Sequence, residues 1–163
     1  ASPTVPLQKK FDIRLKCPKL NEKYPYSKLC IIYKDSRNRV RYVGGTYYDG
    51  WIEGQVRAFG KFNITVDSVG PIIKPLDFED GKVISKYNTL ELTIQDNLSG
   101  IKNYKAYIND KWVLMIYDRK KRRYIIPLNH RSRIHLKKGE NEIKIKSSDY
   151  KKNHSILTKT VIY

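Results

Sequence analysis

Residues 90–108 have the sequence LELTIQDNLSGIKNYKAYI, which contains two strand patterns separated by a polar turn. Apolar and polar residues alternate from Leu90 to Ile94, and the same alternation returns from Tyr104 to Ile108. Between these segments lies the turn sequence DNLSG, in which Gly100 can adopt a positive φ. A period of two is typical of strands that bury one face, so this stretch predicts two β-strands joined by a tight turn.

The same pattern of short strands and turns extends along the whole chain. Segments of strand length with alternating or continuous apolar residues occur at residues 11–15, 29–33, 40–43, 61–66, 112–117, 124–128 and 156–162. The sequence contains no amphipathic helical pattern of ten or more residues. Many short strands with frequent turns predict an all-β fold built from β-sandwich units.

Residues 67–71 (DSVGP) combine glycine and proline and mark a boundary between two strand-rich segments. We therefore predict two consecutive β-sandwich domains, at residues 1–69 and 70–163. The second has the size of an immunoglobulin-like domain, and we predict that fold for it. The first is small, and we expect it to lack a piece at its N-terminal side.

The charge of the chain indicates anionic partners. Its 163 residues include 33 Lys and Arg against 16 Asp and Glu, a formal net charge of +17. Such a surplus attracts nucleic acid, acidic glycans, lipopolysaccharide phosphates or a membrane surface. Because the basic residues are spread along the chain, general solubility is the alternative interpretation. No apolar run approaches the roughly 18 residues of a membrane-spanning helix.

The densest basic run is RKKRR at residues 119–123. It lies between the predicted strands 112–117 and 124–128, so we expect it at the exposed tip of a hairpin. No acidic residue occurs from Arg119 to Lys138. The candidate anion-binding residues are Arg119, Lys120, Lys121, Arg122, Arg123, Arg131 and Arg133.

Three aromatic residues, Tyr47, Tyr48 and Trp51, flank the turn Asp49-Gly50. An aromatic platform beside a turn can stack on sugar rings, which makes these residues candidates for glycan binding. The favoured interpretation is that they pack across a hairpin or at a domain interface, where large aromatic side chains are commonly found.

The two cysteines, Cys17 and Cys30, do not form a C-x-x-C motif, so a structural zinc site is not supported. They are thirteen positions apart and can close one disulfide in an oxidising compartment. The alternative, which we favour slightly, is a pair of buried thiols that act as small hydrophobic residues.

No catalytic constellation is recognisable in the sequence. No two of the histidines His130, His135 and His154 lie two to four residues apart, as zinc ligands on one element do. The G-x-S-x-G turn that carries a nucleophilic serine is also missing. We therefore predict no catalytic residue, no metal ligand and no cofactor for this chain.

Acidic residues that could bind a metal ion occur in three of the predicted turns. Asp77, Glu79 and Asp80 lie in one loop, where carboxylates can bind calcium. No spaced D-x-D-x-D series follows, so a solvated loop is the favoured interpretation. The same holds for Asp96 and Asp149, although two turns at one end of a sandwich can share an ion.

Several motifs of the second segment resemble those of bacterial immunoglobulin-like domains. These domains often carry D-x-x-P-P-x-I at their entry, D-x-x-S-G-I in a turn and D-x-x-G-N near the last strand. The matching stretches here are residues 66–75 (VDSVGPIIKP), 94–101 (IQDNLSGI), 139–143 (GENEI) and 149–153 (DYKKN). Lys152 stands where the last motif has glycine, which puts the conformation of that turn in doubt.

A longer match adds residues 43–47, 50–52, 57–60 and 109–118. With these, nearly the whole chain is similar to the region that follows the catalytic domain in lysostaphin-type zinc peptidases of the Bacteroidetes. The resemblance implies an exported protein of the periplasm or cell envelope, with a zinc peptidase domain in cis. The H-x-x-x-D and H-x-H zinc motifs of that domain are absent here, so this chain by itself is not expected to be an enzyme.

The resulting hypothesis is a non-catalytic accessory or binding region of a peptidoglycan metallopeptidase, which positions the enzyme or contacts anionic envelope polymers. One alternative is a nucleic-acid-binding β domain, which needs aromatic and basic residues interleaved on one sheet face. Its candidate residues are Trp112, Tyr117, Arg119 and Tyr124. A structural spacer without a ligand is the other alternative.

Overall fold

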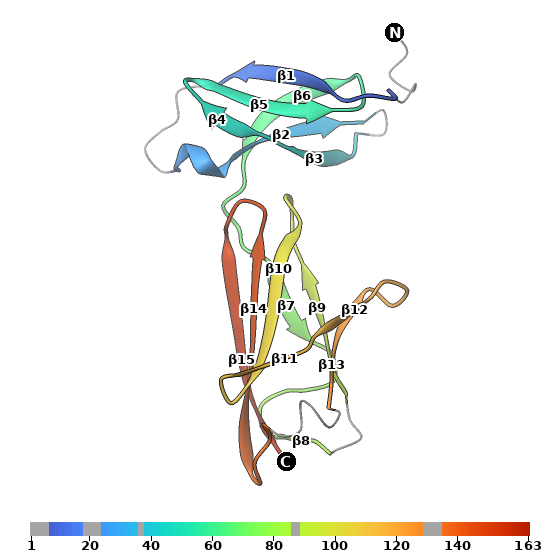
Figure 1. The fold of residues 1–163 in the computed structure, drawn as a ribbon, viewed down its shortest axis with the longest axis vertical. Coiled ribbons are helices and arrows are strands. Elements are labelled where there is room, and N and C mark those ends of the chain that lie inside the picture. Colours follow the sequence, from blue (N-terminus) through green and yellow to red (C-terminus); the bar gives the residue numbers. More distant parts are fainter. Residues whose placement is uncertain (1–6, 18–23, 36–37, 86–88, 129–134) are drawn as a thin grey trace. The chain divides into compact units, whose positions relative to one another are not determined.

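A computed structural model describes residues 7–17, 24–35, 38–85, 89–128 and 135–163. The chain divides into two compact units, Ala1–Ser68 and Val69–Tyr163, one residue from the junction expected from the sequence. Almost all regular structure in the described residues is β-strand (Figure 1). None of the helices described is long and apolar enough to cross a membrane.

The first unit contains two three-stranded antiparallel sheets, with strand orders β1-β5-β4 and β3-β2-β6. A single 3-10 turn, η1 (Tyr26–Lys28), precedes the central strand of the second sheet. The strands are β1 (Phe11–Lys16), β2 (Leu29–Lys34), β3 (Val40–Gly44), β4 (Thr46–Tyr48), β5 (Trp51–Val56) and β6 (Lys61–Val66).

The core of the first unit lies between its two sheets. Leu29 and Ile31, which share one face of β2, and Ile52 of β5 are fully buried there. Gly45 has a φ of +112°, and a Cβ added to it would lie 2.8 Å from the side chain of Ile52. A side chain at this position is therefore excluded by both the backbone and the packing.

The structure contains no disulfide between Cys17 and Cys30; both are thiols, so the candidate disulfide is not formed. Cys17 packs against the cluster that contains Leu29 and Ile31. Cys30 lies between these two residues on β2, so its side chain points to the opposite face, where its Sγ lies 3.7 Å from the carbonyl oxygen of Thr65. The two thiols therefore lie on opposite faces of the β2 sheet.

The second unit contains a five-stranded sheet with the order β11-β10-β14-β15-β8 and a four-stranded sheet with the order β12-β13-β9-β7. All pairs are antiparallel except β15 and β8. The strands are β7 (Ile72–Pro75), β8 (Lys82–Val83), β9 (Thr89–Gln95), β10 (Ile101–Ile108), β11 (Lys111–Val113), β12 (Ile116–Asp118), β13 (Arg123–Pro127), β14 (Glu140–Asp149) and β15 (His154–Ile162).

This topology is that of an immunoglobulin-like sandwich. In that fold, strands A, B, E and D form one sheet and strands C, F and G form the other. Here β7, β9, β13 and β12 take the first set of positions, and β10, β14 and β15 take the second. The predicted all-β fold with a second, immunoglobulin-like sandwich is therefore confirmed.

A contiguous hydrophobic core fills the space between the two sheets of the second unit. Every second residue of β9 and of the inner part of β14 is buried, as the sequence alternation predicts. The buried core residues are Phe78, Ile84, Leu90, Leu92, Ile94, Ala106, Ile108, Val113, Met115, Tyr124, Ile126, Leu128, Ile143, Ile145 and Val161.

The turn between β14 and β15 is built around the buried carboxylate of Asp149. Its Oδ1 accepts hydrogen bonds from the backbone N–H groups of Lys151 and Asn153, both at 2.8 Å. Its Oδ2 accepts one from the side-chain amide of Asn153 at 2.6 Å. Lys152 has a φ of +60°, the left-handed conformation for which the related motif has glycine. The turn is therefore retained with a lysine in a position that favours glycine.

Replacing Lys152 by glycine is expected to stabilise the second unit, because glycine adopts a positive φ without the steric cost of a Cβ. The gain is about 0.5–1 kcal/mol, the difference between the cost of a left-handed lysine and the backbone entropy that glycine loses. Calorimetry should show a thermal midpoint higher by roughly 4 °C. Lys138→Gly is the control, since Lys138 is exposed and outside the positive-φ region. The control should lower the midpoint, and a decrease for Lys152→Gly would contradict this account.

Candidate anion-binding site

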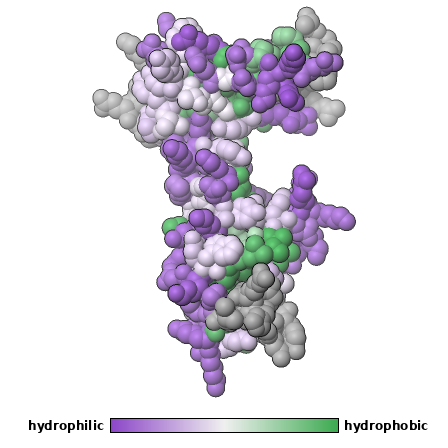
Figure 2. Space-filling model, viewed as in Figure 1, coloured by the Kyte–Doolittle hydropathy of each residue, from purple (hydrophilic) through white to green (hydrophobic). Residues whose placement is uncertain are grey.

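The structure places the basic run in the turn that joins β12 to β13, where Arg119, Lys120, Lys121 and Arg122 are all exposed. The carboxylate of Asp118 accepts hydrogen bonds from the backbone N–H groups of Lys120 (2.9 Å) and Lys121 (3.1 Å), which fixes the start of the turn. Hydrophilic side chains project where this hairpin ends (Figure 2). Among the described residues, none of these four cations takes part in an ion pair. We call them the basic tip.

Arg123 is not part of this exposed tip. It begins β13 and is half-buried, and its guanidinium pairs with the carboxylate of Glu91 on the neighbouring strand β9. Its charge is therefore offset within the fold and is not available to a ligand. Arg131 and Arg133, the remaining candidates, lie outside the described residues.

A second group of cations lies on the outer face of the five-stranded sheet. Lys105 of β10 is paired in register with Lys146 of β14, so the two side chains leave the sheet directly opposite each other. Like charges in this position destabilise a sheet. Both lysines are exposed, and neither forms an ion pair within the described part of the chain. The Nζ of Lys146 lies 5.2 Å from the centroid of the Tyr107 ring.

The neighbouring Lys144 shows the contrast. Its Nζ lies 2.8 Å from a carboxylate oxygen of Asp110 and 2.7 Å from one of Glu142. The hydrogen bond with Asp110 makes the largest contribution to raising the pKa of Lys144, and the one with Glu142 the next largest. The contact between Lys144 and Asp110 also lowers the pKa of Asp110. The outer face therefore contains one lysine that is neutralised by the fold and a facing pair of lysines that is not.

The lysine pair borders a shallow hollow of about 310 Å³. Its lining also contains groups that can donate hydrogen bonds, from a histidine, a serine and an amide. The hydroxyl of the second serine, Ser147, donates to the carbonyl oxygen of Asn103 at 3.0 Å. The lining residues are Asn103, Tyr104, Lys105, Lys146, Ser147, Ser148 and His154. Two ammonium groups with neutral donors beside them suit a phosphate, sulfate or carboxylate group. We call this site the lysine hollow.

Sequence reasoning did not identify Lys105 or Lys146 as site residues. The alternation of apolar residues in β10 and β14 indicates that both lysines face outward, because Ala106 and Ile145 face the core. That the two lysines face each other depends on the pairing register of two strands about forty residues apart, which no local pattern determines.

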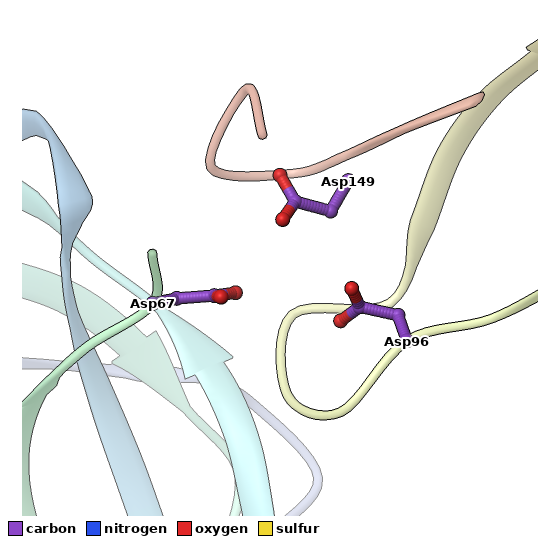
Figure 3. A group of neighbouring side chains, drawn as sticks. All are labelled: Asp67, Asp96 and Asp149. Atoms are coloured by element: carbon purple, nitrogen blue, oxygen red, sulfur yellow. The ribbon is translucent and has the colours of Figure 1, made fainter. Parts of the chain in front are cut away.

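Asp96 and Asp149, the aspartates of the two turn motifs in the second unit, each accept hydrogen bonds from the backbone of the turn in which they lie (Figure 3). Asp96 Oδ2 accepts hydrogen bonds from the backbone N–H groups of Leu98 (3.0 Å) and Gly100 (2.7 Å), as Asp149 does in its own turn. Carboxylate oxygens of Asp96 and Asp149 lie within 4.8 Å of each other, a separation that one metal ion could bridge. An ion shared by the two turns therefore stays a hypothesis. Asp67, also labelled, belongs to the first unit, where its N–H donates to the Lys28 carbonyl at 3.0 Å.

The acidic loop at Asp77–Asp80 is held by hydrogen bonds within the second unit. Asp77 accepts one from the backbone N–H of Glu91 at 2.7 Å, and burial raises the pKa of Asp77. Asp80 accepts one from the Lys159 ammonium at 2.6 Å, which lowers the pKa of Asp80. These bonds account for two of the carboxylates without a metal.

The histidines are dispersed within the part of the chain that the structure describes. The carbonyl of His135 accepts a hydrogen bond from the Asn109 amide at 2.8 Å, and His154 begins β15. His130 lies outside the described residues. No described histidine belongs to a group of three potential metal ligands.

The residues of the nucleic-acid alternative do not share a sheet face. Trp112 lies on β11 of the five-stranded sheet, whereas Tyr117 and Tyr124 lie on β12 and β13 of the other sheet. Tyr124 is buried, with its ring centroid 4.7 Å from that of Tyr104 and 4.8 Å from that of Tyr117. The rings of Tyr104 and Tyr117 pack on Tyr124 and are themselves partly exposed. Because Trp112 lies on the other sheet and Tyr124 is buried, the proposed aromatic and basic face is not formed by this set.

Burial, with the neighbouring tyrosines Tyr104 and Tyr117, raises the pKa of Tyr124 to about 12. Because the pKa in an unfolded chain is about 10, the stabilisation from the neutral phenol is present below pH 10 and lost as the pH rises toward 12. In urea unfolding at pH 8–11.5, Tyr124→Phe should lose less stability than the wild type over this range. Tyr150→Phe, at an exposed tyrosine, is the control and should follow the wild type. Parallel curves for Tyr124→Phe and the wild type would contradict this account.

The three aromatic residues of the first unit have different environments. Tyr47 packs on the core, and its ring is stacked on that of Tyr26 at a centroid distance of 4.1 Å. Tyr48 is 68% exposed and lies opposite Trp51 in the β4–β5 hairpin. Trp51 is half-buried, with the guanidinium carbon of Arg14 4.8 Å from its ring centroid. Tyr48 and Trp51 therefore share the outer face of their sheet, and Tyr47 does not.

The chain is similar to one family model and to a solved structure. Residues 1–67, within the first unit, match the family model of the Zu5-like domain. A solved structure of Clostridium thermocellum CbhA fibronectin(III)-like modules is similar at a TM-score of 0.42 and 12% identity, covering 96% of this chain and 86% of that chain. No curated protein matches the sequence.

Proposed function

We propose that this chain is a non-catalytic binding region of an exported cell-envelope peptidoglycan metallopeptidase, and that its second unit binds anionic polymers of the envelope. The observation that carries the binding role is the presence of two exposed groups of cations, the basic tip and the lysine hollow, with no ion pairs among the described residues. The peptidase, its position in cis and the periplasmic or envelope location rest on the sequence resemblance.

The physical argument comes from the difference between paired and unpaired cations. Arg123 and Lys144 have carboxylate partners, so the fold already neutralises them. The facing lysines Lys105 and Lys146 repel each other, a cost that an anion between them would remove. A polymer with repeated phosphate or carboxylate groups can bind at such sites without shape complementarity. The net charge of +17 increases the rate at which an anionic polymer meets the protein.

Removing either cation group should weaken binding to an anionic polymer. The tip variant replaces Arg119, Lys120, Lys121 and Arg122 by serine and keeps the ion-paired Arg123; the hollow variant is Lys105→Gln with Lys146→Gln. Both should elute from heparin and from purified sacculi at lower salt than the wild type, because binding that depends on point charges is screened by ions.

The matched control removes four exposed cations of the first unit by serine substitution at Lys9, Lys10, Arg57 and Lys61. It changes the net charge as much as the tip variant does, and its retention should stay close to that of the wild type. Unchanged retention of both test variants would contradict the proposal, as would wild-type binding that survives near 1 M salt, where the Debye length is about 3 Å. Strong preference for one nucleic-acid sequence would also contradict it and favour the nucleic-acid alternative.

The peptidase context is tested separately by the coding sequence upstream of Ala1. The proposal expects an H-x-x-x-D motif followed by an H-x-H motif there, which together supply zinc ligands. An upstream sequence without these motifs would contradict the peptidase assignment and leave the binding experiment unaffected.

A further inference from the structure

The outer face of the β1-β5-β4 sheet presents a continuous row of polar and aromatic side chains. In register, Arg14 of β1 lies opposite Glu53 of β5, and Glu53 lies opposite Thr46 of β4. Two residues further along each strand, and so on the same face, Trp51 of β5 lies opposite Tyr48 of β4. Since alternate residues of these strands pack on the core, all of these side chains point away from it.

This face contains a hollow of about 590 Å³, within the range of small-ligand sites. The lining of this hollow includes Ile13 and two glycines, Gly45 and Gly54, which expose only backbone atoms to it. The polar side chains that line it are Asp12, Arg14, Thr46, Glu53 and Gln55.

The polar side chains of the hollow hold one another in place. The amide of Gln55 donates to Asp12 Oδ1 at 3.0 Å, and Arg14 Nε lies 3.0 Å from Glu53 Oε1. Amide, guanidinium and carboxylate groups have more donors and acceptors than these two contacts use. Arg14 and Glu53 are each about half exposed, 51% and 50%, so the remaining donors and acceptors can reach a ligand.

The aromatic side chains lie at one end of this polar row. Tyr48 is largely exposed. The guanidinium of Arg14 lies over the Trp51 ring and so connects Trp51 to the polar residues. A pyranose has an apolar C–H face and a rim of hydroxyl groups. An exposed aromatic ring beside fixed donors and acceptors matches both features.

We infer that this face, defined by Tyr48, Trp51 and the polar hollow, is a binding site for an uncharged oligosaccharide. The four charged side chains of the face, Asp12 and Glu53 against Arg14 and Lys16, cancel, which disfavours a polyanion. The site belongs entirely to the first unit and goes beyond the proposed function, because its ligand class differs from that of the second unit.

The test uses the intrinsic fluorescence of the full chain, which contains two tryptophans. Trp112→Phe, at an exposed position of the second unit, leaves Trp51 as the single reporter. Chitotetraose and cellotetraose serve as probes. We expect a saturable change in Trp51 fluorescence with at least one of them, unchanged in 1 M salt because the ligand has no charge.

Adding Tyr48→Ala to this background should lower the affinity about tenfold, since a stacked aromatic ring is lost. Tyr150→Ala, which removes an exposed tyrosine of the second unit, is the matched control and should leave the affinity unchanged. Trp51→Phe, which keeps Trp112, should report no change with either sugar. Asp12→Ala provides a second variant that does not alter the aromatic residues, and it should also weaken binding.

The inference would be overturned by the absence of a saturable change with either probe up to millimolar concentration. Equal affinities for the parent and for both the Tyr48→Ala and Asp12→Ala variants would overturn it as well. Loss of the signal in 1 M salt would also overturn it, because the probe is uncharged. Since the retention experiment on the second unit uses other residues and anionic polymers, failure of this test is distinguishable from failure of the proposed function.

Discussion

The second unit depends on the buried carboxylate of Asp149, which fixes the turn between β14 and β15. It accepts three hydrogen bonds from Lys151 and Asn153 and is fully buried, so the turn has one favourable geometry. That geometry sets the register of β14 against β15, and a slip of one residue would exchange the two faces of the strand. Because this register is fixed, the side chains of Ile143 and Ile145 point into the core, and those of Lys144 and Lys146 point outward.

The same register generates the candidate site. β14 is also paired with β10, and the pairing that buries Ala106 against Ile145 places Lys105 opposite Lys146 on the outer face. The fold supplies carboxylates to some of its cations, as Glu91 does for Arg123 and Asp110 does for Lys144. Other exposed cations, such as Lys9 and Arg57, also form no ion pair among the described residues. We assign the binding role to the basic tip and the lysine hollow because one turn gathers four such cations and the strand register sets two others opposite each other.

Local patterns predicted most of the strands, the immunoglobulin-like sandwich and the exposed hairpin turn at residues 119–122, since alternation and turn residues act over a few positions. The single strand expected at residues 112–117 is wrong, because β11 ends at Val113 and β12 begins at Ile116 in the other sheet. They did not predict the ion pair of Arg123 with Glu91 or the position of Lys105 opposite Lys146. Both depend on the pairing register between strands that are distant in the sequence. The turn at Lys152 also differs from expectation. The hydrogen bonds of Asp149 hold that residue at a positive φ even though it is not glycine.

The central claim is that Lys105 and Lys146 face each other without a neutralising partner. The most direct measurement is the calorimetric midpoint of Lys105→Glu at low salt, with Lys105→Gln as the control. If the pair is repulsive, glutamine should raise the midpoint slightly and glutamate should raise it further, because it converts a like-charge pair into an opposite-charge pair. The difference between the two variants should shrink at high salt. A midpoint for Lys105→Glu at or below that of Lys105→Gln would contradict the claim.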